Sequence, residues 1–317
     1  MPCYHPLQGY RSRSDGKTIV FNPTHGWVDR PLTIPCGQCV GCRLERSRQW
    51  AVRCVHEASL HEDNCFITLT YNNENLPEDG SLNKKHFKDF MKRLRKKYVP
   101  KNPYDKKYEK AEFDKFQAEN GIRYYHCGEY GDKNFRPHYH AIIFGLQFDD
   151  QKLFTVTNGE KLYTSETLEK LWPFGFSTIG SVTFESAAYV ARYVMKKVNG
   201  KNAKNHYERV DSNTGEIYNL VPEYNTMSRR PGIAARWFDK YKDDVYPSDN
   251  IHLREKTFRP PKFYDKMYEH LMPEEMEKIK LARMKNMQKH AKDNTAERLA
   301  VKEQVKNAQL NKLIRSI

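Results

Sequence analysis

Two apolar, aromatic segments joined by a short polar stretch constrain the fold of this chain most strongly. The segments read IRYYHCGEYG (122–131) and PHYHAIIFG (137–145), and DKNFR lies between them. Aromatic and β-branched residues favour strands, and so short a connection favours an antiparallel hairpin. The two segments therefore predict neighbouring strands of an antiparallel sheet.

The surrounding pattern extends this sheet and adds helices to it. FITLTY and its flanks (64–71) and GFSTIGSV (175–182) predict two more strands, and helical spacing of apolar residues predicts helices over 39–61, 83–98, 165–172 and 185–200. Asn83 or Ser81 could cap the second helix. The order β-α-β-β-α-β-α predicts an α+β fold, an antiparallel sheet with helices packed on it.

Outside this region the pattern is weaker. Residues 1–35 are rich in Pro, Gly and polar residues and are expected to be irregular, whereas 273–317 predict one or two polar helices. We therefore expect an N-terminal Cys-containing segment (1–60), a central core (61–200) and a C-terminal extension (201–317), largely helical from about residue 273.

The charge of the chain indicates a polyanionic partner. Lysine and arginine number 54 against 40 acidic residues, a net charge of +14, which favours nucleic acid. The seven cysteines and the absence of an export signal predict reduced thiols in a cytosolic compartment. No apolar stretch is long enough to predict a membrane span.

Two histidines alternate in the strand PHYHAIIFG. Residues i and i+2 of a strand share a face, so His138 and His140 project together while Tyr139 points to the other side. Such a pair can bind one divalent metal ion, or it can be two ordinary strand histidines. Glu129, at the end of the neighbouring strand, would complete a His-His-Glu set that suits Mg²⁺ or Mn²⁺.

Two tyrosines are four residues apart in AAYVARYVMKK (187–197). Tyr189 and Tyr193 share one face of the predicted helix. They can simply pack there, or a tyrosine oxygen can attack phosphorus and form a covalent link to DNA. Arg192 and Lys197 lie on the same helix.

Three cysteines are bunched in PCGQCVGCR. Cys36, Cys39 and Cys42 follow C-x₂-C-x₂-C, and the sequence RLER that follows excludes the ferredoxin pattern. A structural zinc ion with Cys3 or His5 as fourth ligand is one interpretation, and three reduced thiols at a turn are the other.

Together these blocks resemble a known superfamily. FITLTYNNENLP, GEYGDKNFRPHYHAIIFG and YVARYVMKK occur in the order found in HUH endonucleases of the rolling-circle type, and with PCGQCVGCR they resemble the replication initiation proteins of gokushovirus-like microviruses. The resemblance implies a five-stranded antiparallel sheet with flanking helices, a ferredoxin-like variant. Four strands are evident in the sequence, and the fifth is expected within 20–35 or beyond 200.

The resemblance also implies a site. His138, His140 and Glu129 would be metal ligands, Tyr189 and Tyr193 the nucleophiles, and Lys196 the lysine that follows the tyrosine in the superfamily. Such a protein nicks single-stranded origin DNA through a 5′-phosphotyrosine link and religates it during rolling-circle replication.

DNA contacts are expected from Arg136, Arg192 and Lys197. Because the chain has no P-loop, a host helicase and host replication machinery are expected partners, in the cytoplasm of the bacterial host. The alternative function is a non-catalytic basic protein that binds or packages single-stranded DNA.

Overall fold

The chain forms two compact units. The computed structural model describes residues 3–131, 134–157, 159–192, 203–210, 214–253 and 255–312. One unit spans residues 48–264, and the other combines residues 1–47 with 265–316. The segment boundaries predicted at residues 60 and 200 do not coincide with the boundaries of these compact units. They stay predictions about function. No helix among the described residues is both long and apolar enough to span a membrane.

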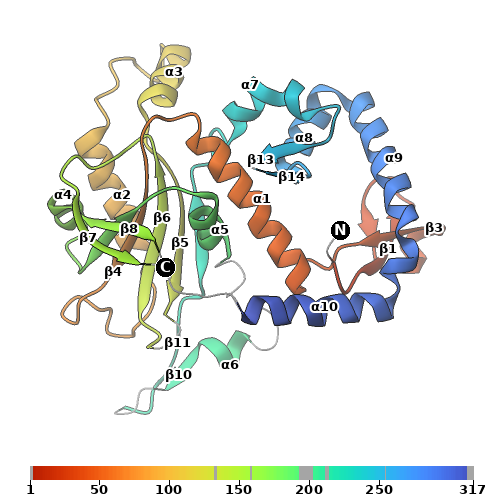
Figure 1. The fold of residues 1–317 in the computed structure, drawn as a ribbon, viewed down its shortest axis with the longest axis horizontal. Helices are drawn as coiled ribbons and strands as arrows, with labels where there is room; N and C mark the ends of the chain where they lie inside the picture. The colour runs from red at the N-terminus through yellow and green to blue at the C-terminus, as the bar shows by residue number, and fades with distance from the viewer. Residues whose placement is uncertain are drawn as a thin grey trace. The chain divides into compact units, whose positions relative to one another are not determined.

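A seven-stranded antiparallel sheet forms the centre of the 48–264 unit (Figure 1). Its order is β12-β5-β6-β4-β9-β8-β7. The strands are β4 (Asn64–Thr70), β5 (Arg123–Tyr130), β6 (Pro137–Phe144), β7 (Lys152–Thr157), β8 (Glu160–Thr164), β9 (Ser177–Gly180) and β12 (Tyr224–Met227). The predicted α+β class and the hairpin of β5 with β6 are confirmed.

The predicted count of five strands is wrong. The fifth strand expected beyond residue 200 is β12, which pairs with β5. Two further strands, β7 and β8, pair with each other and extend the sheet beyond β9. Their segment is mostly solvent-exposed and has no clean apolar face, but the Asn-Gly pair at 158–159 is a hairpin signal that could have predicted them.

The pairing of the central strands shows which residues share each face of the sheet. His138 lies opposite Glu129 on β5 and opposite Thr70 on β4, and His140 lies opposite Thr68. We call the side that carries these residues the site face. The other side, the core face, carries apolar and aromatic residues of one buried cluster, among them Ile67, Leu69, Tyr139, Ala141 and Ile143.

Helix α2 (Lys84–Tyr98) covers the core face, together with α4 (Glu166–Leu171) (Figure 1). The helix begins where the Asn83 side chain accepts a hydrogen bond from the Lys85 amide, so Asn83 rather than Ser81 is the cap. Its buried residues are Phe87, Phe90, Met91 and Leu94, at the predicted helical spacing. Each contributes about 1.5–3 kcal/mol through burial.

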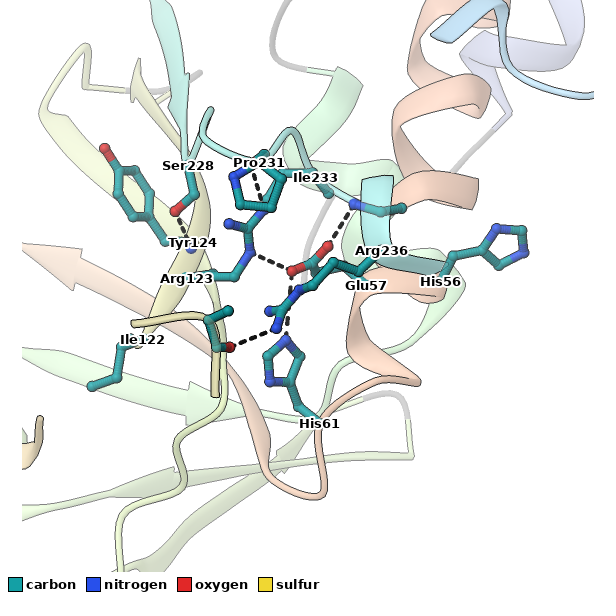
Figure 2. A network of polar contacts seen from close by, with 12 residues as sticks. His56, Glu57, His61, Ile122, Arg123, Tyr124, Ser228, Pro231, Ile233 and Arg236 are labelled. Atoms are coloured by element: carbon teal, nitrogen blue, oxygen red, sulfur yellow. Dashed lines mark hydrogen bonds and ion pairs between the residues drawn. The ribbon is translucent and has the colours of Figure 1, made fainter. Parts of the chain in front are cut away.

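Helices α1 (Val40–Ala58) and α5 (Phe184–Arg192) pack on the site face. Trp50 of α1 stacks on Tyr125 of β5, with ring centroids 4.9 Å apart. Further along α1, the buried Glu57 accepts hydrogen bonds from the Arg123 guanidinium and the Ala234 amide (Figure 2). Arg123 also donates to the carbonyl of Pro231 at 2.8 Å. This buried ion pair joins α1, β5 and the segment before α7 (Ala235–Val245).

The remaining elements of this unit are short or peripheral. They are α3 (Lys110–Asn120), α6 (Ala203–Tyr207), β10 (Glu208–Val210), β11 (Ile217–Asn219), β13 (Ile251–Leu253) and β14 (Lys256–Phe258). Helix α8 (Lys262–Leu271) contains the boundary between the two units.

The other unit contains a three-stranded sheet, so the expectation of an irregular 1–35 is wrong. Its elements are β1 (Leu7–Ser12), β2 (Ile19–Val20), η1 (Pro23–His25) and β3 (Gly26–Ile34), with sheet order β2-β1-β3. A Cβ atom on Gly9 would lie 2.6 Å from Ile34, and one on Gly26 would lie 2.4 Å from Tyr10. The glycines that suggested irregular chain are therefore required for close packing inside the sheet.

The C-terminal segment is helical, as predicted. It contains α9 (Pro273–Lys289), η4 (Ala291–Asn294) and α10 (Ala296–Asn311). Arg283 of α9 makes a bidentate ion pair with Asp265 of α8, at 2.7 and 2.8 Å. The two parallel hydrogen bonds of such a pair fix the orientation of α9 relative to α8.

Candidate active site

Three side chains converge on the site face. Glu129 comes from β5, and His138 and His140 come from β6. The Oε1 atom of Glu129 lies 2.7 Å from Nε2 of His138 and 3.0 Å from Nε2 of His140. Glu129 and His140 are buried, whereas His138 is half-buried. The structure thus brings together the three predicted ligands, with His138 on the accessible side.

The other ring nitrogen of each histidine is also held. His138 Nδ1 lies 3.1 Å from the carbonyl oxygen of Arg136, and because a carbonyl only accepts, Nδ1 donates. With Nδ1 donating, Nε2 carries a lone pair for a metal ion in the neutral ring, and in the protonated ring it donates to Glu129 instead. His140 Nδ1 is bonded to the Thr68 hydroxyl at 2.9 Å. Such second contacts are typical of metal-binding histidines, because they fix the tautomer and the ring orientation.

The charge of Glu129 suits a cation. Burial raises the pKa of its carboxyl group, but the hydrogen bonds from His138 and His140 outweigh this and lower the pKa to about 2. The carboxylate is therefore ionised at neutral pH. Two nitrogen ligands and one anionic oxygen, with their ligand atoms within 4.8 Å of one another, fit a single divalent metal ion.

Tyr189 lies beside this group. It projects from α5, and its ring meets the ring of His140 edge-on, with centroids 5.2 Å apart and an interplanar angle of 86°. Phe66 of β4 stacks on His140 at 5.6 Å and meets Tyr189 at 6.4 Å. Ala187 and Val190 of the same helix are buried. The helix therefore holds one predicted nucleophile against a predicted metal ligand.

The start of α5 is fixed by a reciprocal cap. The Ser186 amide donates to the Thr183 hydroxyl at 3.1 Å, and the Thr183 amide donates to the Ser186 hydroxyl at 2.8 Å. A cap of this kind satisfies amides that the first turn leaves open. Residues 193–200 of the predicted helix, with Tyr193, Lys196 and Lys197, lie outside the described residues.

The two arginines expected to contact DNA have different surroundings. Arg136 donates to the Asn73 side chain at 2.9 Å and to the Tyr71 carbonyl at 3.0 Å, so it joins the ends of β4 and β6. Arg192 is the last residue of α5 and is half-buried. Their DNA contacts stay predictions.

Tyr139 lies on the core face, opposite to its two histidine neighbours, as the alternation predicts. Its ring is fully buried. Its hydroxyl is bonded to the Tyr71 hydroxyl at 2.9 Å, accepts from the Asn83 amide at 2.8 Å and donates to the Asn83 carbonyl at 3.0 Å. Tyr139 therefore fixes the start of α2, and its hydroxyl lies on the opposite face from the candidate metal ligands.

Two site residues were not predicted from the sequence. Phe66 and Thr68 of β4 orient the ring of His140, one by stacking and the other by a hydrogen bond. The period of two along FITLT places both on one face, which is the signal that could have identified them. That these residues lie beside His140 could not be predicted, because it depends on the pairing of β4 with β6.

The cysteine cluster forms a second candidate metal site. Cys3, Cys36, Cys39 and Cys42 place their sulfur atoms within 4.8 Å of one another, in an arrangement that could hold a metal ion. His5, the other candidate for the fourth ligand, lies instead 2.7 Å from Glu303 of α10. The structure therefore favours Cys3.

Comparison with known proteins places the chain in a family. Residues 64–198 match the family described as replication-associated protein ORF2/G2P. Replication-associated protein VP4 of Bdellovibrio phage phiMH2K is 35% identical over 280 residues, which cover 86% of this chain and 79% of that protein. Replication-associated protein ORF2 of Spiroplasma virus 4 is 33% identical over 288 residues, 85% of this chain and 81% of that protein.

A third relative matches a shorter stretch. Replication-associated protein ORF4 of Chlamydia phage 1 is 37% identical over 169 residues, 52% of this chain and 38% of that protein. No solved structure matches the chain. The predicted resemblance is confirmed, and the chain belongs to the replication-associated protein family of microvirus-type phages.

Proposed function

We propose that this protein is a metal-dependent HUH endonuclease that nicks and rejoins single-stranded DNA to initiate rolling-circle replication. The proposal rests on the position of Tyr189, whose ring lies against the ring of His140. His140 belongs to a Glu-His-His group whose possible ligand atoms lie close together. The family match supports it, because residues 64–198 include every proposed ligand and nucleophile. The printed names of the relatives support a role in replication.

The chain's own groups define the chemistry. The hydroxyl oxygen of Tyr189 attacks the scissile phosphorus, a bond from phosphorus to tyrosine oxygen forms, and the bond to the 3′-oxygen breaks. The tyrosine loses its proton and the released 3′-oxygen gains one, so the products are a 3′-hydroxyl and a 5′-phosphotyrosine. A Mg²⁺ or Mn²⁺ ion held by Glu129, His138 and His140 would supply Lewis-acid polarisation of the phosphate.

A second tyrosine would permit religation. Tyr193 is one helical turn from Tyr189 in the sequence and could attack a second origin copy, while the freed 3′-hydroxyl reverses the first link and closes the circle. Lys196 would favour the ionised tyrosine or the departing oxygen by its charge. Arg136, Arg192 and Lys197 would contact DNA phosphates, in keeping with the net charge of +14.

The proposed partners are single-stranded viral DNA with its origin, and a host helicase with the host replication machinery, in the cytoplasm of the bacterial host. A non-catalytic protein that binds or packages single-stranded DNA needs basic and aromatic surface. It has no need of a buried carboxylate directed at two histidines, so the site geometry favours the nickase.

The proposal is tested by covalent adduct formation. The purified chain is incubated with single-stranded oligonucleotides that tile the phage genome, with Mn²⁺ or with EDTA, and products are separated on denaturing gels. We expect an adduct with Mn²⁺ that is absent with EDTA and absent in the Tyr189→Phe/Tyr193→Phe double variant. Tyr108→Phe, at an exposed tyrosine remote from the site in sequence, is the matched control and should retain the adduct.

Each single variant then assigns the first attack. Loss of the adduct in Tyr189→Phe alone would identify Tyr189 as the initiating nucleophile. An adduct of undiminished yield in the double variant would disprove the tyrosine mechanism, and DNA binding without cleavage in any divalent ion would favour the non-catalytic alternative.

A further inference from the structure

The four-cysteine cluster is built from three separate places in the unit formed by residues 1–47 and 265–316. Cys3 lies before β1, Cys36 and Cys39 lie in the loop between β3 and α1, and Cys42 lies in the first turn of α1. Cys3 and Cys39 are buried, and Cys36 and Cys42 are half-buried. All four are free thiols in the structure, although they lie close together.

Backbone amides surround the sulfur atoms. The Cys36 amide donates to Cys3 Sγ at 3.2 Å, and the Tyr4 amide donates to Cys39 Sγ at 3.3 Å. The amides of Gln38 and Cys39 both donate to Cys36 Sγ, at 3.4 and 3.3 Å. Amide donors stabilise a thiolate more than a thiol, because hydrogen bonds to a charged acceptor are stronger. At Cys3, Cys36 and Cys39 these amides favour anionic sulfur, which is the form that binds metal.

The loop between Cys36 and Cys39 is shaped to direct backbone amides at a sulfur atom. Gly37 has a φ of +75°, a left-handed conformation that favours glycine, and it turns the chain so that the next amides point back at Cys36. Cys42, three residues beyond Cys39, lies in the first turn of α1, where the helix dipole favours negative charge.

The spacing of the sulfur atoms distinguishes a single bound ion from an iron–sulfur cubane. A tetrahedral zinc site with Zn–S bonds of about 2.3 Å requires sulfur atoms about 3.8 Å apart, which lies within the observed limit of 4.8 Å. A cubane iron–sulfur cluster inserts several atoms between its thiolates and needs them farther apart. Four cysteine sulfurs this close together suit a single Zn²⁺ ion.

We propose that Cys3, Cys36, Cys39 and Cys42 bind one structural Zn²⁺ ion as a tetrathiolate. The ion would tie the N-terminal residues and the β3–α1 loop to the first turn of α1. A closed set of four protein ligands leaves no position for substrate, so the role is structural rather than catalytic. This site shares no residue with the Glu129, His138 and His140 group, so it can be tested separately from nicking.

The first test is metal content. Full-length protein, purified without chelator and without immobilised-metal resin, is analysed by inductively coupled plasma mass spectrometry. We expect about one zinc ion per chain in the wild type and in the His138→Ala/His140→Ala variant. Cys3→Ser should lose the zinc, whereas Cys54→Ser, the same change at a buried cysteine outside the cluster, should retain it.

A second measurement on the wild type avoids the risk that a cysteine variant fails to fold. X-ray absorption at the zinc edge should give four sulfur scatterers at about 2.3 Å and no nitrogen or oxygen in the first shell. Two disulfides in the cluster by alkylation mass spectrometry, four free thiols without metal, or iron in place of zinc would each overturn the proposal. Zinc that follows the histidines instead of the cysteines would overturn it as well, and none of these outcomes depends on nicking activity.

Discussion

The substitution Tyr139→Phe separates the two faces of the central strand. It removes only the hydroxyl group and keeps the ring, whose packing against Trp172 places the centroids 5.5 Å apart. The hydroxyl has three hydrogen-bond contacts, all on the core face, with Tyr71 and with the amide and carbonyl of Asn83. We therefore expect lower stability and an unchanged active site.

The magnitude follows from these contacts. A buried donor or acceptor that loses its partner costs about 1–3 kcal/mol, and Asn83 is half-buried, so water can replace part of what it loses. From this range we expect a loss of about 2 kcal/mol in the free energy of unfolding. For a unit of this size this corresponds to a melting temperature lower by about 4–8 °C.

The assay combines thermal unfolding with the rate of nicking, measured well below the melting temperature of the variant. The nicking rate should stay within about twofold of wild type, since about 0.4 kcal/mol in the barrier already changes a rate twofold. Tyr108→Phe removes the hydroxyl of an exposed tyrosine and should change neither quantity. If Tyr139→Phe abolished nicking as His138→Ala should, the assignment of faces would be refuted.

Two further predictions concern the buried ion pair of Glu57 and the hydrogen bond of Thr68 to His140. Glu57→Gln leaves the buried Arg123 without a counter-ion and should lower the free energy of unfolding, measured in urea, by about 3 kcal/mol or more. Asp89→Asn, at an exposed ion pair with Lys85, should change this free energy little. Burial raises the pKa of Glu57, but its hydrogen bonds and the charge of Arg123 lower it below the ordinary value. The ion pair therefore stabilises the fold above the unfolded carboxyl pKa of about 4.3, and the difference between Glu57→Gln and wild type should shrink as the pH falls below it. Thr68→Val removes the hydrogen bond to His140 Nδ1 and should raise the Mn²⁺ concentration needed for half-maximal nicking about 10- to 100-fold; an unchanged requirement would show that Thr68 does not orient the ring.

Local periodicity was sufficient to predict the parts of the candidate site that lie on one hairpin. The alternation in PHYHAIIF placed His138 and His140 on one face and Tyr139 on the other, and the short connection between the two strands placed Glu129 near the histidines. The structure gives the register, with Glu129 opposite His138. These relations are set within about twenty residues of chain. They follow from the geometry of a strand and a hairpin alone.

Relations between distant segments could not be obtained in the same way. The contact of Thr68 with His140 depends on the register of β4 against β6, which are separated by 72 residues at this point. The Glu57–Arg123 pair involves charged residues that a local pattern would assign to the surface, and only their mutual neutralisation makes their burial acceptable. The sheet of residues 7–34 was missed because its glycines serve close packing, which local sequence does not distinguish from a loop.

Identifying the residue that becomes linked to DNA distinguishes a tyrosine nickase from a non-catalytic DNA-binding protein. The adduct formed with Mn²⁺ is digested with nuclease and trypsin, and the modified peptide is sequenced by mass spectrometry. We predict a nucleotide joined through phosphate to Tyr189 or Tyr193, and no such peptide from the His138→Ala/His140→Ala variant. A link to a residue outside this helix, or an undiminished tyrosine adduct in that histidine variant, would contradict it.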